Sequence, residues 1–116
     1  MKDKKDNLQQ KVEPTKSELE ILKVLWENGS CTVRQVNDSL NEQTRAVQYT
    51  STLKLMQIMQ DKGLLKRDDT NMKHVYSTAE PEQKTKNALL EKFVDSLYNG
   101  SASNLVMQLL GNKKTN

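Results

Sequence analysis

The sequence predicts a mainly α-helical fold with one small β-hairpin. Three amphipathic helical patterns follow one another between residues 14 and 62, and two short strand patterns come directly after them. Residues 80–111 then return to a helical spacing of apolar side chains. Three short helices closed by a hairpin form a winged helix-turn-helix domain, whose third helix usually enters a DNA groove. We therefore expect a winged helix at residues 14–79 and a separate C-terminal helical segment at residues 80–111.

Length and composition limit the chain to a small protein with a modest core. Its 116 residues fit one domain, or a small domain with an appendage. The hydrophobic fraction of 34% is low, so a partner chain would add burial. Cys31 is the only cysteine, which excludes an intramolecular disulfide and fits a reducing cytoplasm. The sequence shows no long apolar run and no secretory signal, so we expect cytoplasmic localisation without membrane insertion.

Two capping boxes mark the starts of the first two helices. Residues 1–13 are polar and mixed in charge, which predicts a disordered arm before the first box. In each box a threonine and a Glu or Gln three residues later satisfy each other's backbone amides, as predicted for Thr15 with Glu18 and for Thr32 with Gln35. Apolar side chains follow at helical spacing: Leu19, Leu22, Leu25 and Trp26 in the first helix, and Val33, Val36 and Leu40 in the second.

The third helix is expected from about residue 49 to residue 62, after a polar, loop-like segment at residues 41–48. Gly63 is expected to end it in the left-handed conformation. The residues predicted for its buried face are Tyr49, Thr52 or Leu53, Met56 and Met59. The residues predicted mostly for its outer face are Thr50, Ser51, Lys54, Gln57 and Asp61.

The predicted hairpin comprises strands at residues 64–67 and 73–77. Residues 68–71 between them are rich in turn-forming side chains. Three cations flank this turn and are candidates for contact with phosphate: Lys66, Arg67 and Lys73. Charged wing residues are often only solvated, so the alternative for each of them is a surface charge without a ligand.

The outer face of the third helix has the chemistry of a surface that reads DNA. Hydroxyls and amides hydrogen-bond base edges, while lysine contacts phosphate. Residues 45–79 hold six Lys or Arg against three Asp or Glu, although an ordinary solvated surface explains so small an excess about as well. The candidate DNA-binding residues on this helix and just before it are Thr50, Ser51, Lys54, Gln57, Arg45 and Gln48.

The residue pattern indicates neither catalysis nor a metal or cofactor site. His74 is the only histidine, which excludes a histidine-based zinc site and a Ser-His-Asp triad. The carboxylates form no recognisable metal cluster, and no glycine-rich phosphate loop occurs. We interpret Cys31 as a small, partly buried residue rather than as a reactive thiolate. A protein that is not an enzyme and needs no cofactor is expected.

The helical segment at residues 80–111 carries more apolar side chains than it can cover, and residues 112–116 are expected to form a polar tail. Burying one large aliphatic side chain stabilises by roughly 1.5–3 kcal/mol, so leaving the whole set in water is a large loss. These helices either fold back on the winged helix or pack against a second copy. We favour the second, because a symmetric dimer also doubles the DNA contact. The predicted dimer interface comprises Leu89, Leu90, Phe93, Val94, Leu97, Leu105, Val106, Leu109 and Leu110.

Several separate blocks of the chain resemble one family. They are residues 15–26 (TKSELEILKVLW), 32–36 (TVRQV), 49–54 (YTSTLK) continuing through 61–65 (DKGLL), 75–77 (VYS) and 100–106 (GSASNLV). In this order and with these gaps, the chain is similar to the penicillinase repressor family of BlaI/MecI/CopY type over roughly residues 14–110.

The resemblance implies a bacterial transcriptional repressor that binds a palindromic operator as a homodimer. The winged helix would read double-stranded DNA, and the C-terminal helices would form the dimer. Several members are switched off when a membrane sensor's signal leads to cleavage within those helices. Here Gln108 and Leu109 lie near that position and differ from the Asn-Phe pair of the cleaved relatives. The cysteine pairs of the copper-responsive branch do not occur. The alternative function is a winged-helix protein-interaction module without a DNA role, since a fold does not settle a function.

Overall fold

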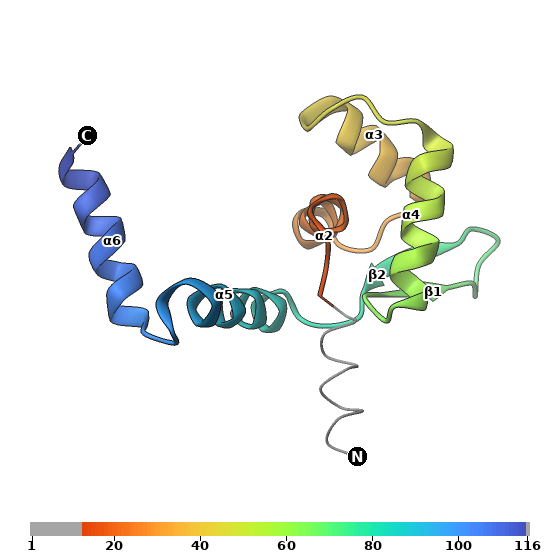
Figure 1. The fold of residues 1–116 in the computed structure, drawn as a ribbon. Helices are drawn as coiled ribbons and strands as arrows, with labels where there is room; N and C mark the ends of the chain where they lie inside the picture. The colour runs from red at the N-terminus through yellow and green to blue at the C-terminus, as the bar shows by residue number, and fades with distance from the viewer. Residues whose placement is uncertain (1–12, 116) are drawn as a thin grey trace, which may run out of the picture. The chain divides into compact units, whose positions relative to one another are not determined.

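The computed structural model describes residues 13–115. The chain divides into two compact units, of which the first ends at Pro81 and the second begins at Glu82. Nearly all of the predicted N-terminal arm lies outside the described residues. The elements of the first unit are α2 (Lys16–Asn28), α3 (Val33–Gln43), α4 (Tyr49–Asp61), β1 (Leu65–Asp68) and β2 (Val75–Thr78), and those of the second are α5 (Glu82–Tyr98) and α6 (Ala102–Thr115) (Figure 1). The first unit is a winged helix, and the predicted mainly α-helical fold with a small hairpin is confirmed.

Both predicted capping boxes are present. The backbone N–H of Thr15 donates to Glu18 Oε1 at 2.9 Å, and the N–H of Glu18 donates to Thr15 Oγ1 at 3.2 Å. Thr32 and Gln35 repeat this exchange at 2.8 and 3.2 Å. Each cap satisfies amides that the first helical turn leaves open, a contribution of about 1 kcal/mol. The local sequence at each capping box therefore determines where α2 and α3 begin.

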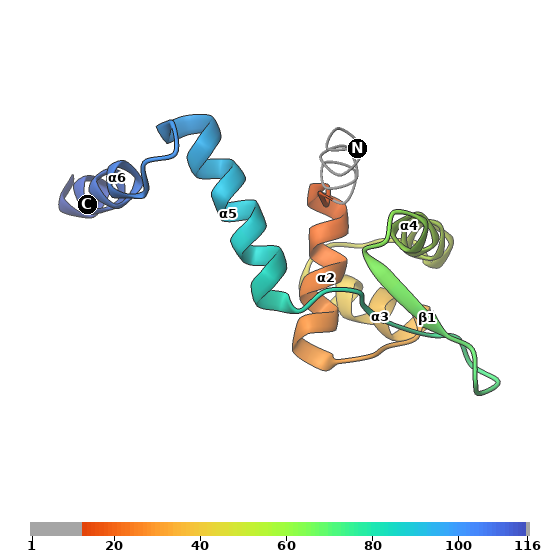
Figure 2. The same ribbon diagram turned by 90° about the horizontal axis from the view of Figure 1, so that it is seen from below.

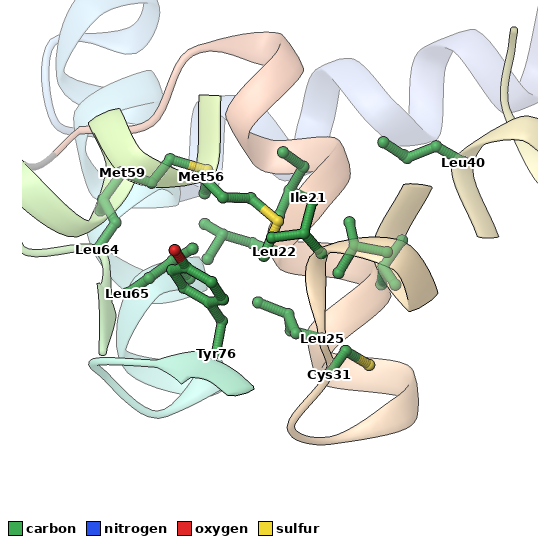
Figure 3. Packing of buried hydrophobic residues seen from close by; sticks show 13 residues of the cluster. Ile21, Leu22, Leu25, Cys31, Leu40, Met56, Met59, Leu64, Leu65 and Tyr76 are labelled. Atoms are coloured by element: carbon green, nitrogen blue, oxygen red, sulfur yellow. The ribbon is translucent and has the colours of Figure 1, made fainter. Parts of the chain in front are cut away.

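One hydrophobic core joins all elements of the first unit. Leu22 and Leu25 from α2, Met56 and Met59 from α4, and Tyr76 from β2 are all buried in it (Figure 3). The two methionines fill the space between the helices and the hairpin. Both were predicted to lie on the buried face of the third helix, and both are buried. Tyr76 was not predicted as a core residue, although it is 1% exposed.

The hairpin pairs β1 with β2 in an antiparallel register from Leu65 with Thr78 to Asp68 with Val75. Cys31 adds a short bridge, since its N–H donates to the Tyr76 carbonyl at 2.9 Å and its own carbonyl accepts from the Tyr76 N–H at 2.8 Å. Burial raises the pKa of the Cys31 thiol, which confirms its interpretation as a small, partly buried residue.

The boundaries of the hairpin and of α4 differ slightly from expectation. Lys73 and His74 were assigned to a strand, but they belong to the turn, because β2 begins only at Val75. Gly63 has a φ of +85°, so the predicted left-handed residue after α4 is confirmed. Figures 1 and 2 both show the turn of the hairpin projecting beyond the three helices.

The second unit consists of two helices joined at a sharp turn. Asn99 and Gly100 both have positive φ angles, 51° and 81°, which ends α5 where the sequence predicted a stop. Ser101 Oγ then accepts from the Asn104 N–H at 3.2 Å and caps α6. The helix continues through Thr115 and so includes most of the residues expected to form a polar tail.

Candidate nucleic-acid interface

The outer face of α4 is an exposed polar surface with one cation. Thr50, Ser51, Lys54 and Gln57 are all exposed, while Thr52, Met56 and Met59 are buried. The chain has no Asp or Glu between Glu42 and Asp61, so this face offers hydroxyls, amides and a lysine, and its one acid, Asp61, lies at the last residue of α4. Four of the predicted site residues are therefore presented together by one helix.

Tyr49 was predicted to lie on the buried face of α4, and this prediction is wrong. It is 37% exposed, and its ring lies under the guanidinium of Arg34, whose Cζ is 4.6 Å from the ring centroid. Tyr49 is the first residue of α4, where the helix has not yet reached the core, and the cation–π contact covers the ring instead. Arg34, the second residue of α3, thus adds a second cation beside the first turn of α4.

Two asparagines of α3 hold the segment just before α4. The Asn37 side-chain amide donates to the Val47 carbonyl at 3.0 Å and to Thr52 Oγ1 at 2.8 Å. Asn41 donates to the same carbonyl at 2.9 Å and accepts from the Val47 N–H at 2.9 Å. We call Asn37 and Asn41 the amide clamp. Because Val47 immediately precedes Gln48, the N-cap of α4, the clamp sets the direction in which α4 begins.

The opposite end of α4 is held by a buried ion pair. Lys62, which caps the C-terminus of α4, donates to both carboxylate oxygens of Glu18 at 2.8 and 3.0 Å. Glu18 is only 2% exposed and also closes the capping box of α2. The pair therefore joins the start of α2 to the end of α4, and the outer face of α4 is positioned by polar contacts at both ends of its helix.

The sequence contained a signal for the amide clamp but none for the ion pair. Asn37 is a polar residue at a helical position between Val33, Val36 and Leu40, on the face that was predicted to be buried. Such a residue requires a buried hydrogen-bond partner. The sequence around Lys62 and Glu18 gave no such signal, because a charged residue at either position is usually exposed to solvent.

Arg45 and Gln48, predicted to contact DNA just before α4, differ in their surroundings. Arg45 forms an ion pair with Glu20 of α2 at 3.0 Å and keeps about half of its side chain exposed. Gln48 is exposed, and its side chain does not cap α4. Both residues line an open groove that Ser51, Lys54 and Ile58 continue along α4. The groove runs beside the predicted recognition face.

The cations of the hairpin are partly neutralised by acids of its own turn. Arg67 Nε lies 2.9 Å from Asp69 Oδ1, and His74 Nδ1 lies 2.6 Å from the same oxygen. Hydrogen bonds that the Arg67 guanidinium donates to Tyr76 and Asp69 raise the pKa of Arg67. All three predicted cations, Lys66, Arg67 and Lys73, are exposed, and Arg67 is paired with Asp69.

The Asp69 contacts predict a measurable change in titration. The hydrogen bond from His74 is the largest cause that lowers the pKa of Asp69, and Arg67 adds to it. We expect His74→Ala to raise this pKa toward the ordinary value of 3.8. Because the folded-state pKa is depressed, the pair stabilises above the ordinary pKa and loses that effect as the pH falls through the lowered one. Carboxyl NMR titration measures the shift, and an Asp69 pKa unchanged in the variant would contradict it.

The predicted dimer-interface residues of the second unit are mostly uncovered. Leu89 and Leu105 are half-buried and Val94 is buried, while the remaining members are exposed: Leu90, Phe93, Leu97, Val106, Leu109 and Leu110. Phe93 and Tyr98 pack on each other with ring centroids 6.1 Å apart. Met107, which the sequence analysis did not include, is exposed as well. Six large apolar side chains of the prediction thus remain available to a partner.

Within residues 13–115 no group of three or more His, Cys, Asp or Glu side chains is arranged to hold a metal ion. Over the same part of the chain, every helix is too short or too polar to cross a membrane.

The three-helix core, the projecting hairpin and the exposed polar face of α4 define a winged helix-turn-helix protein with a separate helical unit. A family model described as penicillinase repressor matches residues 14–116. The chain therefore belongs to the penicillinase repressor family, a family of transcriptional regulators and not of enzymes. A comparison with curated proteins finds no significant match.

Proposed function

We propose that the chain is a sequence-specific transcriptional repressor that binds a palindromic operator as a homodimer, with α4 in the major groove. The observation that carries this proposal is the face of α4, where Thr50, Ser51, Lys54 and Gln57 are exposed together. Hydroxyl and amide side chains match the donor and acceptor pattern of base edges in the major groove. A regulator of this kind acts in the cytoplasm by occupying its operator.

The start of α4 suits a phosphate group. The capping boxes satisfy the first amides of α2 and α3, whereas Gln48 makes no side-chain hydrogen bond to the first turn of α4. The Ser51 N–H donates to the Gln48 carbonyl at 3.1 Å, so the N–H groups of Tyr49 and Thr50 and the positive end of the helix dipole are those open to an anion. Arg34 lies beside this turn through its contact with Tyr49. A phosphate held here would fix α4 in the groove, while Lys54 and Gln57 reach further along it.

Dimerisation would use the exposed apolar side chains of α5 and α6. A twofold pair presents two α4 helices, and it matches the symmetry of a palindromic site. Gln108 and Leu109 lie inside α6, so cleavage between them would remove Leu109 and Leu110 from the interface. Proteolysis at this point, triggered through a membrane sensor, would weaken the dimer and release the operator.

Lys54→Ala tests the DNA interface. Lys54 is exposed on the proposed contact face, so we expect the variant to fold normally and to bind its operator at least fivefold more weakly. Affinity is measured by fluorescence anisotropy on an operator duplex across a salt series. If Lys54 contacts phosphate, binding to unrelated DNA falls as well and the salt dependence becomes shallower by about one ion. If it reads a base, only specific binding falls.

Lys84→Ala is the control, because it removes an exposed lysine from α5 of the second unit. Equal operator affinity in the two variants and in the unaltered protein would remove Lys54 from the site. If the unaltered protein binds no DNA at low salt, the proposed function fails, and the alternative of a protein-interaction module gains support.

A further inference from the structure

Ile58 is an apolar residue on the polar outer face of α4. Its side chain is 40% exposed, and it follows Lys54 by one helical turn and Ser51 by two. Leu53 and Leu55 of the same helix pack against the hydrophobic core, whereas Ile58 is not among the residues that do so. A branched aliphatic side chain at this position leaves apolar surface in water next to the C-terminal end of the proposed contact face.

The environment of Ile58 favours a nucleic acid as the partner of that apolar surface. Ile58 lines the open groove together with Gln48, Ser51 and Lys54, and Asp61 follows it by one helical turn at the end of α4. The acid that lines the groove, Glu20, is paired with Arg45, so Lys54 leaves the lining with a net positive charge. A polyanion is therefore complementary in charge to the side chains around Ile58. The major groove of DNA presents one apolar group to such a surface, the C5 methyl group of thymine.

We propose that Ile58 determines specificity by contacting the C5 methyl group of a thymine in the operator. This inference rests on the proposed function and adds to it a base identity and an atom. The polar neighbours Ser51 and Lys54 bind phosphate or heteroatoms of the bases, and none of those contacts separates thymine from uracil. Ile58 supplies that distinction by burying its methyl groups against the methyl group of the base.

The experiment replaces single thymines of the operator by uracil, which removes only the C5 methyl group. A duplex is first selected from a random-sequence pool by the unaltered full-length protein. Its affinity is then measured with each thymine replaced in turn, for the unaltered protein, for Ile58→Ala and for Ile58→Val. At one thymine of each half-site we expect uracil to weaken binding by the unaltered protein roughly fourfold, the effect of losing one buried methyl group.

The variants decide whether Ile58 makes this contact. Ile58→Ala is expected to bind the thymine and uracil duplexes within a factor of about 1.5 of each other, since the alanine methyl group is too short to reach the base. Ile58→Val keeps a branched side chain and is expected to retain at least half of the discrimination on a logarithmic scale. Thermal unfolding of both variants monitors the fold, and Ile58 lies outside the core.

Two results would overturn the inference and leave the proposed function standing. One is specific binding in which no uracil substitution matters. The other is a methyl effect of equal size in the unaltered protein and in Ile58→Ala. If no duplex is retained from the pool at low salt, the proposed function itself fails. The outcomes therefore distinguish an error about Ile58 from an error about DNA binding.

Discussion

Lys62→Ala is expected to lower the free energy of unfolding of the winged helix by about 2–3 kcal/mol. The substitution leaves the Glu18 carboxylate buried with the Thr15 N–H as its remaining hydrogen-bond donor, and removing one member of a buried pair typically costs about 3–5 kcal/mol. We take a smaller value because Lys62 remains about one quarter exposed. Urea denaturation followed by the fluorescence of Trp26, the only tryptophan, reports on this unit.

Two further variants test the cause of this loss. Arg45→Ala breaks the more exposed ion pair with Glu20 in the same unit, and we expect it to cost less than about 1 kcal/mol. In the double variant Glu18→Gln with Lys62→Met, no charge is buried and glutamine keeps the capping box, so most of the lost stability should return. Equal losses for Lys62→Ala and Arg45→Ala would show that burial of Glu18 does not govern the effect.

Phe93→Asp combined with Leu97→Asp is expected to convert a dimer into a monomer. The two exposed side chains are one turn apart on α5, and each contributes twice in a symmetric pair. At roughly 1.5–3 kcal/mol for each buried side chain, the dissociation constant of the dimer should rise by at least about 100-fold. Sedimentation velocity at about 10 µM, a concentration at which a dimer with a micromolar dissociation constant is mostly assembled, measures the change.

Gln83→Asp combined with Asn87→Asp is the matched control, because it places the same two charges one turn apart on exposed polar positions of α5. It should leave the sedimentation coefficient unchanged. Operator affinity should fall with the dimer in the Phe93→Asp, Leu97→Asp variant, since a monomer engages only one half-site. If that variant sediments like the unaltered protein, the result would contradict the proposed interface, and monomeric behaviour of the unaltered protein would contradict the dimer itself.

Local features of the fold were predictable, and long-range polar contacts were not. Thr15 and Glu18 are three residues apart, so their capping box follows from the sequence and a helical backbone. The same Glu18 binds Lys62 across 44 residues, and Asn37 binds Thr52 across 15. No periodicity of the chain relates such distant residues, because their meeting depends on how the helices pack.

Burial of aromatic side chains shows the same limit. Tyr76 was left outside the predicted core and is almost fully buried, whereas Tyr49 was assigned to the buried face and is exposed beneath Arg34. A tyrosine suits either environment, since it joins an apolar ring to a polar hydroxyl. Tyr76 enters the core because strand β2 packs against the helices, whereas Tyr49 lies at the exposed first residue of α4.

The amino-acid sequence alone determined the order of the helices and strands and the polar outer face of α4. Those properties depend on residue spacing within one element and on caps within one turn. The tertiary structure decided how that face is held, through the amide clamp before α4 and the Glu18–Lys62 pair at its end, and it placed Arg45 against Glu20. These contacts join residues of different helices, so they exist only once packing of the core has brought the helices together.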